Sequence, residues 1–206
     1  SNIIALQTSV LVCLATFVEG YSTNMSEESM MFYALLEEMA KYQRMHRWIC
    51  LCIQISCGGF LLLERNCFPL IISIINENFS QTSDTYLIAK IHNTLIELML
   101  CYGKELTIEY APKIGREIIN EISGIYLEGY LMCELSRSID IRLIPSIFKC
   151  IIQFIDLLGP DINSLMVEEA NNPPQQFVEQ LKQNIDVYLR SPYKSARGLA
   201  IEILAH

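Results

Sequence analysis

A short proline-containing phrase occurs three times in this chain, at residues 68–71, 111–114 and 144–147. In every copy isoleucine stands two and six positions after the proline. Residues four apart lie on one face of a helix, so each copy carries an apolar stripe. Proline suits the first turn of a helix, because its missing N–H has no intrahelical partner there. The phrase therefore predicts three helices that start at proline and bury the pairs Ile71/Ile75, Ile114/Ile118 and Ile147/Ile151.

A repeated amphipathic helix needs neighbours to cover its apolar face, as in proteins built from stacked helical units. We therefore expect an all-α fold made of helix pairs, without β-strands. The 206 residues suit a single helical-repeat domain, and we expect it to be a fragment of a longer chain. Residues 1–59 would form atypical, capping helices and residues 60–206 the repeat units. A mobile loop is expected near residues 169–174, where asparagine and proline are concentrated.

Glycines and turn-forming residues divide the chain into further helices. Gly20, Gly58-Gly59, Gly103 and Gly159 follow stretches with helical periodicity and are interpreted as breaks. Ser123-Gly124 is interpreted as another break, Asp84 as a helix cap, and residues 163–169 as one or two helical turns. The segments expected to be helical are 3–19, 30–47, 48–57, 60–65, 69–78, 85–102, 112–122, 125–136, 145–158, 175–189 and 193–205.

Prolines at positions 69, 112, 145 and 192 are separated by irregular steps of roughly 40 residues. Residues 67–75 followed by 87–98 resemble a helix pair of a HEAT or armadillo unit, and residues 189–205 resemble the start of another. This resemblance implies a right-handed α-α superhelix with a concave surface that binds partners. The segment that contains residues 103–105 and Pro112 is also similar to large nuclear transport receptors.

Composition and charge narrow the classes of partner. The chain is 51% hydrophobic and 18% charged, below the ~25% charged residues usual in soluble domains. Such a chain buries a large core or exposes apolar surface that something else covers. The net charge is −8, and residues 1–103 and 104–206 contribute −4 each. Because nucleic-acid affinity is built from lysine and arginine contacts to phosphate, we expect a neutral to basic protein partner instead.

Eight cysteines suggest at first a disulfide framework, but six of them fall inside apolar helical stretches. Free cysteine behaves there as a small hydrophobic residue, so the sequence favours a reducing compartment, cytoplasmic or nuclear. The most apolar window, residues 49–63, is too short for the ~20 residues of a membrane span.

The proline phrases carry a second, polar column on the face opposite the isoleucines. If the three helices stack in register, these side chains form one polar strip, and the alternative is a merely solvated face. We predict that this strip binds the partner. Its residues are Ser73, Glu77, Arg116, Asn120, Lys149 and Gln153. Ala5, Leu11, Met31 and Phe32 are predicted exposed apolar contacts, for a longer array or for a second copy of the chain.

No pattern of residues indicates catalysis or a bound cofactor. His46 and Cys50 are four apart, with Cys57 two turns on, but a metal site needs a further convergent ligand. The adjacent acidic pairs 27–28, 37–38 and 168–169 diverge instead of converging on a substrate. We therefore expect no enzyme activity, no catalytic residues, no cofactor and no metal.

The function predicted is that of a non-catalytic scaffold or adaptor, which binds a partner protein or peptide along its helical-repeat surface. A first alternative is a segment of a nuclear transport receptor-like protein. A second is a nucleic-acid-associated helical-repeat protein, which would need Lys113, Arg116 and Lys149 in one basic patch. A homo-oligomer is compatible with the predicted function and with both alternatives.

Overall fold

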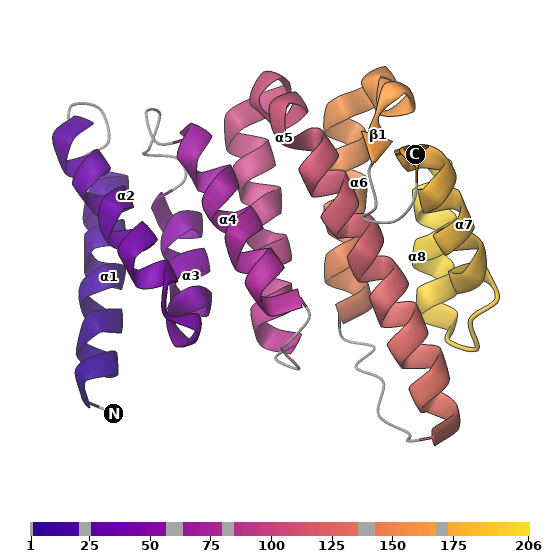
Figure 1. Ribbon diagram of the computed structural model, residues 1–206, viewed down its shortest axis with the longest axis horizontal. Coiled ribbons are helices and arrows are strands. Elements are labelled where there is room, and N and C mark those ends of the chain that lie inside the picture. Colours follow the sequence, from indigo (N-terminus) through magenta and orange to yellow (C-terminus); the bar gives the residue numbers. More distant parts are fainter. Residues whose placement is uncertain (1, 21–25, 57–63, 80–84, 136–142, 168–172) are drawn as a thin grey trace. The chain divides into compact units, whose positions relative to one another are not determined.

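The computed structural model describes residues 2–20, 26–56, 64–79, 85–135, 143–167 and 173–206 (Figure 1). Of these residues 90% are helical, so the prediction of an all-α fold is confirmed at that level. The α-helices are α1 (Asn2–Gly20), α2 (Ser26–Ala40), α3 (His46–Ser56), α4 (Glu64–Phe79), α5 (Thr85–Leu135), α6 (Ile144–Leu158), α7 (Phe177–Leu189) and α8 (Lys194–Ala205). The shorter elements are the 3-10 helices η1 (Gln43–Met45) and η4 (Gly159–Ser164) and the strands β1 (Met166–Val167) and β2 (Gln175–Gln176).

The chain divides into two compact units, with the boundary between Tyr102 and Gly103. Gly103 has φ 71° and ψ −171°, which interrupts α5 where the sequence predicted a break. That backbone region is open almost only to glycine. The predicted division into capping helices and repeat units at residues 59–60 stays a prediction.

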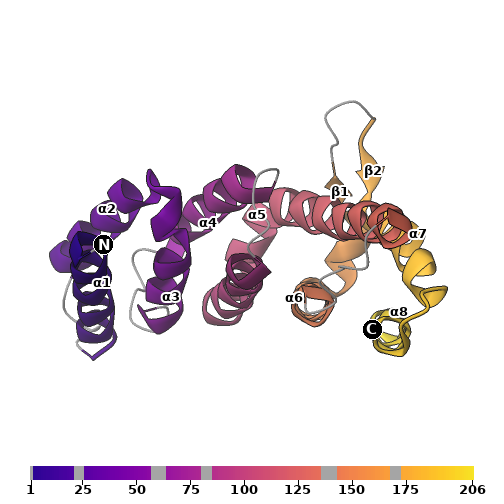
Figure 2. The ribbon, with the colours of Figure 1, turned by 90° about the horizontal axis from the view of Figure 1, so that it is seen from below.

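In the first unit the helices form two layers. α1 packs on α3, while α2 packs on α3 and α4. Figure 2 shows α2 and α4 in one layer, with α1, α3 and the first part of α5 in the other. Buried aromatic and aliphatic side chains fill the space between the layers, among them Phe32, Ile53 and Phe68. The Phe68 ring meets Tyr102 edge-on, with centroids 5.9 Å apart.

A buried polar bridge joins α3 to α5 within this unit. The amide nitrogen of Gln54 donates to the Thr94 hydroxyl at 2.9 Å and to the Lys90 carbonyl at 3.1 Å. The Thr94 hydroxyl in turn donates to the Lys90 carbonyl at 2.8 Å. Thr94 is fully buried, so its hydroxyl group forms hydrogen bonds with protein groups instead of with water. The bridge fixes the register of the two helices.

Thr94→Val should therefore destabilise the chain by about 1 kcal/mol, the typical net value of a buried hydrogen bond. The shape of the side chain is kept while the acceptor for Gln54 is lost. Urea denaturation followed by circular dichroism measures the change. The exposed Asn93→Ala is the neighbouring control and should have a smaller effect. Equal stabilities of the Thr94→Val protein and the wild type would contradict the bridge.

The second unit has the same two-layer arrangement. Figure 2 shows the second part of α5 in one layer with α7, and α6 in the other layer with α8. The Phe154 and Phe177 rings pack edge-on with centroids 5.5 Å apart, and Phe148 packs on Tyr188 at 5.4 Å. The Tyr188 hydroxyl donates to the Ile122 carbonyl at 3.0 Å. These contacts fasten α7 to both α5 and α6.

The prolines do not play the same role in the three phrases. Pro145 lies in the first turn of α6, as predicted. Pro69 and Pro112 lie inside helices, because α4 begins five residues earlier, at Glu64, and α5 runs through position 112. An interior proline costs about 3 kcal/mol, and each buried side chain beside it contributes about 1.5–3 kcal/mol. Burial of Phe68 and Leu70 therefore outweighs the local preference.

The isoleucine stripes are confirmed. Five of the six isoleucines are at most 2% exposed: Ile71, Ile114, Ile118, Ile147 and Ile151. The side chain of Ile75 lies outside the described part of the structure. The stripes therefore form part of the core, as their spacing indicated.

Three other predictions about local structure are wrong. β1 and β2 pair antiparallel, with Met166 opposite Gln176, so two short strands exist where none was expected. The segment 163–169 does not continue as an α-helix, because η4 ends at Ser164. α5 is uninterrupted at residues 123–124, since a glycine inside a helix costs only about 1 kcal/mol. The predicted break at 58–59, the cap at Asp84 and most of the predicted mobile loop lie outside the described residues.

In the described ranges, no helix combines the length and the apolar character that a membrane crossing requires.

Candidate functional site

The second unit contains a groove of about 510 Å³ between α6, η4, α7 and α8. Most of its lining is aliphatic, and three titratable side chains join it. We call it the α6–α8 groove. Its lining residues are Ile155, Asp156, Gly159, Pro160, Ile162, Asn163, Val178, Leu181, Lys182, Ile185, Ile203, Leu204 and His206.

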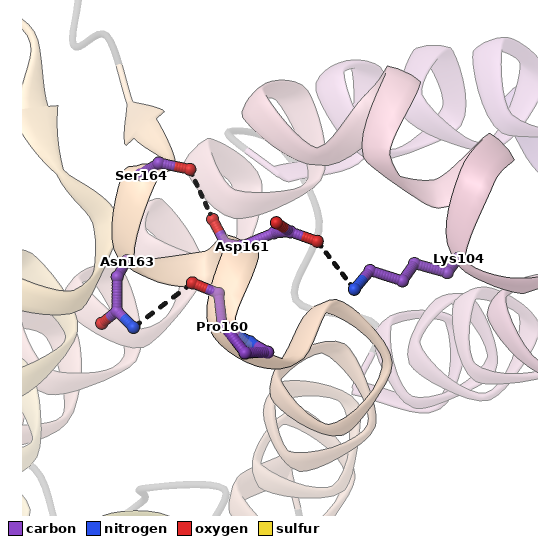
Figure 3. A network of polar contacts seen from close by, with 5 residues as sticks. All are labelled: Lys104, Pro160, Asp161, Asn163 and Ser164. Atoms are coloured by element: carbon purple, nitrogen blue, oxygen red, sulfur yellow. Dashed lines mark hydrogen bonds and ion pairs between the residues drawn. The ribbon is translucent and has the colours of Figure 1, made fainter.

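The turn after α6 forms one wall of the groove. Gly159, with φ 55°, ends the helix and is the first residue of η4, and Pro160 follows it. The Asn163 amide donates to the Pro160 carbonyl at 3.3 Å, and the Lys104 ammonium lies 2.7 Å from the Asp161 carboxylate (Figure 3). This network ties η4 to the start of the second part of α5. Ile162, only 7% exposed, is thereby held inside the groove wall.

The opposite wall is positioned by the start of α7. The Phe177 N–H donates to the Leu165 carbonyl at 2.9 Å, which links α7 to the segment after η4. A Cβ atom added at Gly115 would lie 3.1 Å from the Phe177 ring and 3.4 Å from Val167. The absence of a side chain on α5 at this point lets α7 approach closely.

The charged groups of the groove lie at its edge. Asp156 on α6 and His206 form a pair, with Oδ1 and Nδ1 2.9 Å apart and side chains 50% and 36% exposed. Lys182 on α7 is exposed, and no acidic group of the described residues lies within 4 Å of its ammonium. Among the described residues, the lining includes no serine, threonine or cysteine beside the Asp156–His206 pair. The arrangement therefore has an acid and an imidazole without the hydroxyl or thiol of a nucleophilic triad.

The six residues predicted to form one polar strip fall into pairs on three helices. Ser73 and Glu77 are exposed on α4, in the first unit. In the second unit, Arg116 and Asn120 are half-buried on α5, whereas Lys149 and Gln153 lie on α6 in the other layer (Figure 2). The structure does not bring the second and third pairs together in one layer. The role of these residues in binding a partner stays a prediction.

Two members of this set contact a histidine or a carboxylate of their own unit. A carboxylate oxygen of Glu77 lies 3.5 Å from Nε2 of His46, which also lies 2.7 Å from the Ala40 carbonyl. The Arg116 guanidinium contacts the Glu117 carboxylate at 3.1 Å, and the Glu117 side chain is 6% exposed. Part of the predicted polar column therefore makes contacts within the fold itself.

The predicted exposed apolar contacts are correct for two residues and wrong for two. Met31 is 73% exposed and Ala5 is also exposed. Leu11 and Phe32 are buried, at 2% and 4%, because the faces of α1 and α2 that carry them pack inside the first unit. The exposed stripe of α1 is instead Leu6, Val10 and Leu14.

Possible metal ligands do not cluster in the described residues, and the thiols of Cys50 and Cys52 are buried. No group of three or more histidine, cysteine, aspartate or glutamate side chains there is placed to hold a metal ion. Burial raises the pKa of the Cys50 and Cys52 thiols to about 12. Thiolate, the reactive and metal-binding form, is therefore scarce at neutral pH.

The groove was missed in the sequence because its residues come from separate segments. Asp156 and His206 are fifty positions apart and belong to no pattern. The local signal that could have pointed to it was Gly159-Pro160, which ends α6 and turns the chain into η4.

No known protein family, curated protein or solved structure matches this chain. The function is therefore proposed from the geometry of the α6–α8 groove and the charges around it.

Proposed function

We propose that this protein is a non-catalytic scaffold or adaptor, which binds a partner protein or peptide in the α6–α8 groove. The observation that carries the proposal is an accessible apolar concavity with few polar groups at its edge. Leu204 stands at this edge with 49% of its surface exposed. Concave sites with these properties, in the range of roughly 300–1,000 Å³, are where proteins bury the side chains or ligands of a partner.

We propose further that the chain is a helical-repeat protein of the HEAT or armadillo type, a right-handed α-α superhelix. In support, helices of each unit alternate between two layers (Figure 2). The three isoleucine stripes supply apolar faces of the kind that stacked repeats bury. Cysteines such as Cys50 that lie buried in helices fit a reducing compartment, cytoplasmic or nuclear.

Binding fits the groove better than catalysis does. The Asp156–His206 pair could move a proton, yet the described lining has no serine, threonine or cysteine for it to activate. The second unit also separates the cations that a nucleic-acid site would need. Lys113 and Arg116 lie on α5, whereas Lys149 lies on α6 in the other layer (Figure 2).

Leu204→Glu should reduce recovery of the specific partner by about tenfold, which corresponds to ~1.4 kcal/mol. The reason is that the variant places a carboxylate at the apolar edge of the groove. Affinity purification from cell extract with quantitative mass spectrometry measures the loss. Leu100→Glu is the matched control, because Leu100 is 57% exposed in the first unit and lies outside the groove. Circular dichroism confirms that both variants are folded.

The same experiment should include Arg116→Glu/Lys149→Glu, which tests the predicted polar residues. Partner loss from this variant together with retention by Leu204→Glu would move the binding surface away from the groove. Identical partners in wild type and in all three variants would overturn the proposed function.

A further inference from the structure

The surroundings of the groove are more acidic than its lining. Asp156 and Lys182 balance each other inside it. Glu179 and Asp186 lie one turn before and one turn after Lys182 on α7, and both are exposed. Glu202 precedes the groove residue Ile203 on α8. Apart from Asp161, which pairs with Lys104, the groove and its immediate helix neighbours carry four carboxylates and one lysine, so the local charge is negative in either form of His206.

We propose that the partner of the α6–α8 groove is a basic segment with an aliphatic or aromatic anchor. The anchor enters between α6, α7 and α8, and a lysine or arginine beside it pairs with Asp156. This inference rests on the proposed function, and it names the chemistry of the partner.

The apolar part of the groove provides the affinity. Leu181, Ile185 and Ile203 line it with exposures of 5%, 0% and 4%, so their positions are fixed by packing before a partner arrives. An anchor side chain that leaves water there contributes to affinity through the hydrophobic effect. Preformed walls keep the conformational cost of binding low.

Asp156 provides the preference for a cation. Its Oδ1 atom contacts His206, and its side chain is 50% exposed. An ionised carboxylate accepts several hydrogen bonds, so the pair leaves capacity for a further donor. Lys182 offers a site of opposite sign, but Glu179 and Asp186 lie one turn before and one turn after it on its own helix. A basic partner therefore meets attraction on both sides of the groove, whereas an acidic partner meets attraction at Lys182 alone.

Designed helical peptides of roughly 15 residues test the proposal with the full chain. Three peptides each carry one central leucine on an otherwise polar helix face. They differ only in the residues beside this leucine, which are lysine, glutamine or glutamate. Fluorescence anisotropy at physiological salt measures their affinities. We expect the order lysine, then glutamine, then glutamate, with about two- to fivefold between neighbours, as for exposed ion pairs. Replacing the central leucine by alanine should abolish binding.

Two protein variants with the same change in charge locate the effect. Asp156→Asn should weaken the lysine peptide about two- to fivefold and leave the glutamine peptide unchanged. Glu109→Gln is the matched control, because Glu109 is an exposed residue of α5 outside the groove. It should leave all three affinities as in the wild type.

Several results would overturn the proposal: equal affinities for the three peptides, tightest binding of the glutamate peptide, equal effects of the two variants, or no binding at all. Docking in the groove fails on a different result, the retention of partners by Leu204→Glu. If the three peptides bind with equal affinity and Leu204→Glu abolishes their binding, the groove remains a docking site. Only its charge preference is then removed.

Discussion

Phe177→Ala should lower the free energy of unfolding of the second unit by about 3–5 kcal/mol, the range for a large buried aromatic side chain. Phe177 is fully buried, packs edge-on against Phe154, and lies against Gly115 of α5. Deleting the ring therefore removes contacts with two other helices at once and leaves a cavity that rigid neighbours fill only in part. Urea denaturation followed by far-ultraviolet circular dichroism measures the loss.

Met166→Ala is a suitable control for this substitution. Met166 lies in β1 with 44% of its surface exposed, so its truncation should change stability by less than about 0.5 kcal/mol. Trp48, the one tryptophan of the chain, lies in α3 and reports on the first unit by fluorescence. A loss below about 1 kcal/mol for Phe177→Ala would show that α7 is not anchored through this ring.

Phe177 also affects the shape of the groove. It is followed in α7 by Val178, Leu181 and Lys182, which line the groove. The variant should therefore also loosen the wall that an anchoring side chain would meet. The stability of the unit and the shape of the candidate site depend on the same aromatic contact.

The sequence predicted those features of the fold that depend on local periodicity. The isoleucine stripes were found because residues four apart share a helix face whatever the tertiary arrangement. Gly103 was found because a helical pattern ended there in a residue that tolerates positive φ. Both features follow from the chemistry of a few consecutive residues.

Helix starts and the groove were not predictable in this way. Proline at position 69 was interpreted as a helix start, but burial of Phe68 and Leu70 extends α4 in front of it. Local preferences of a few kcal/mol yield to tertiary burial of similar size. The groove brings together α6, η4, α7 and α8, so no single stretch encodes it. The Asp156–His206 pair depends on the same long-range packing.

Alanine should have opposite effects at two glycines of this chain. Gly103→Ala should destabilise by about 1–3 kcal/mol, because φ 71° with ψ −171° is a region that side chains with a Cβ rarely occupy. Gly198→Ala should stabilise by about 0.5–1 kcal/mol, because Gly198 is exposed within α8 and nothing lies within 4 Å of an added Cβ.

The two glycine variants are best compared by thermal and urea unfolding in the same buffer. The added methyl group also meets nothing within 4 Å at Gly103, so steric contact does not distinguish the two sites, whereas backbone conformation does. The pair therefore measures the conformational strain directly. Stabilisation by Gly103→Ala would mean that α5 passes position 103 as ordinary helix. The boundary between the two units, which falls at this residue, would then lose its structural basis.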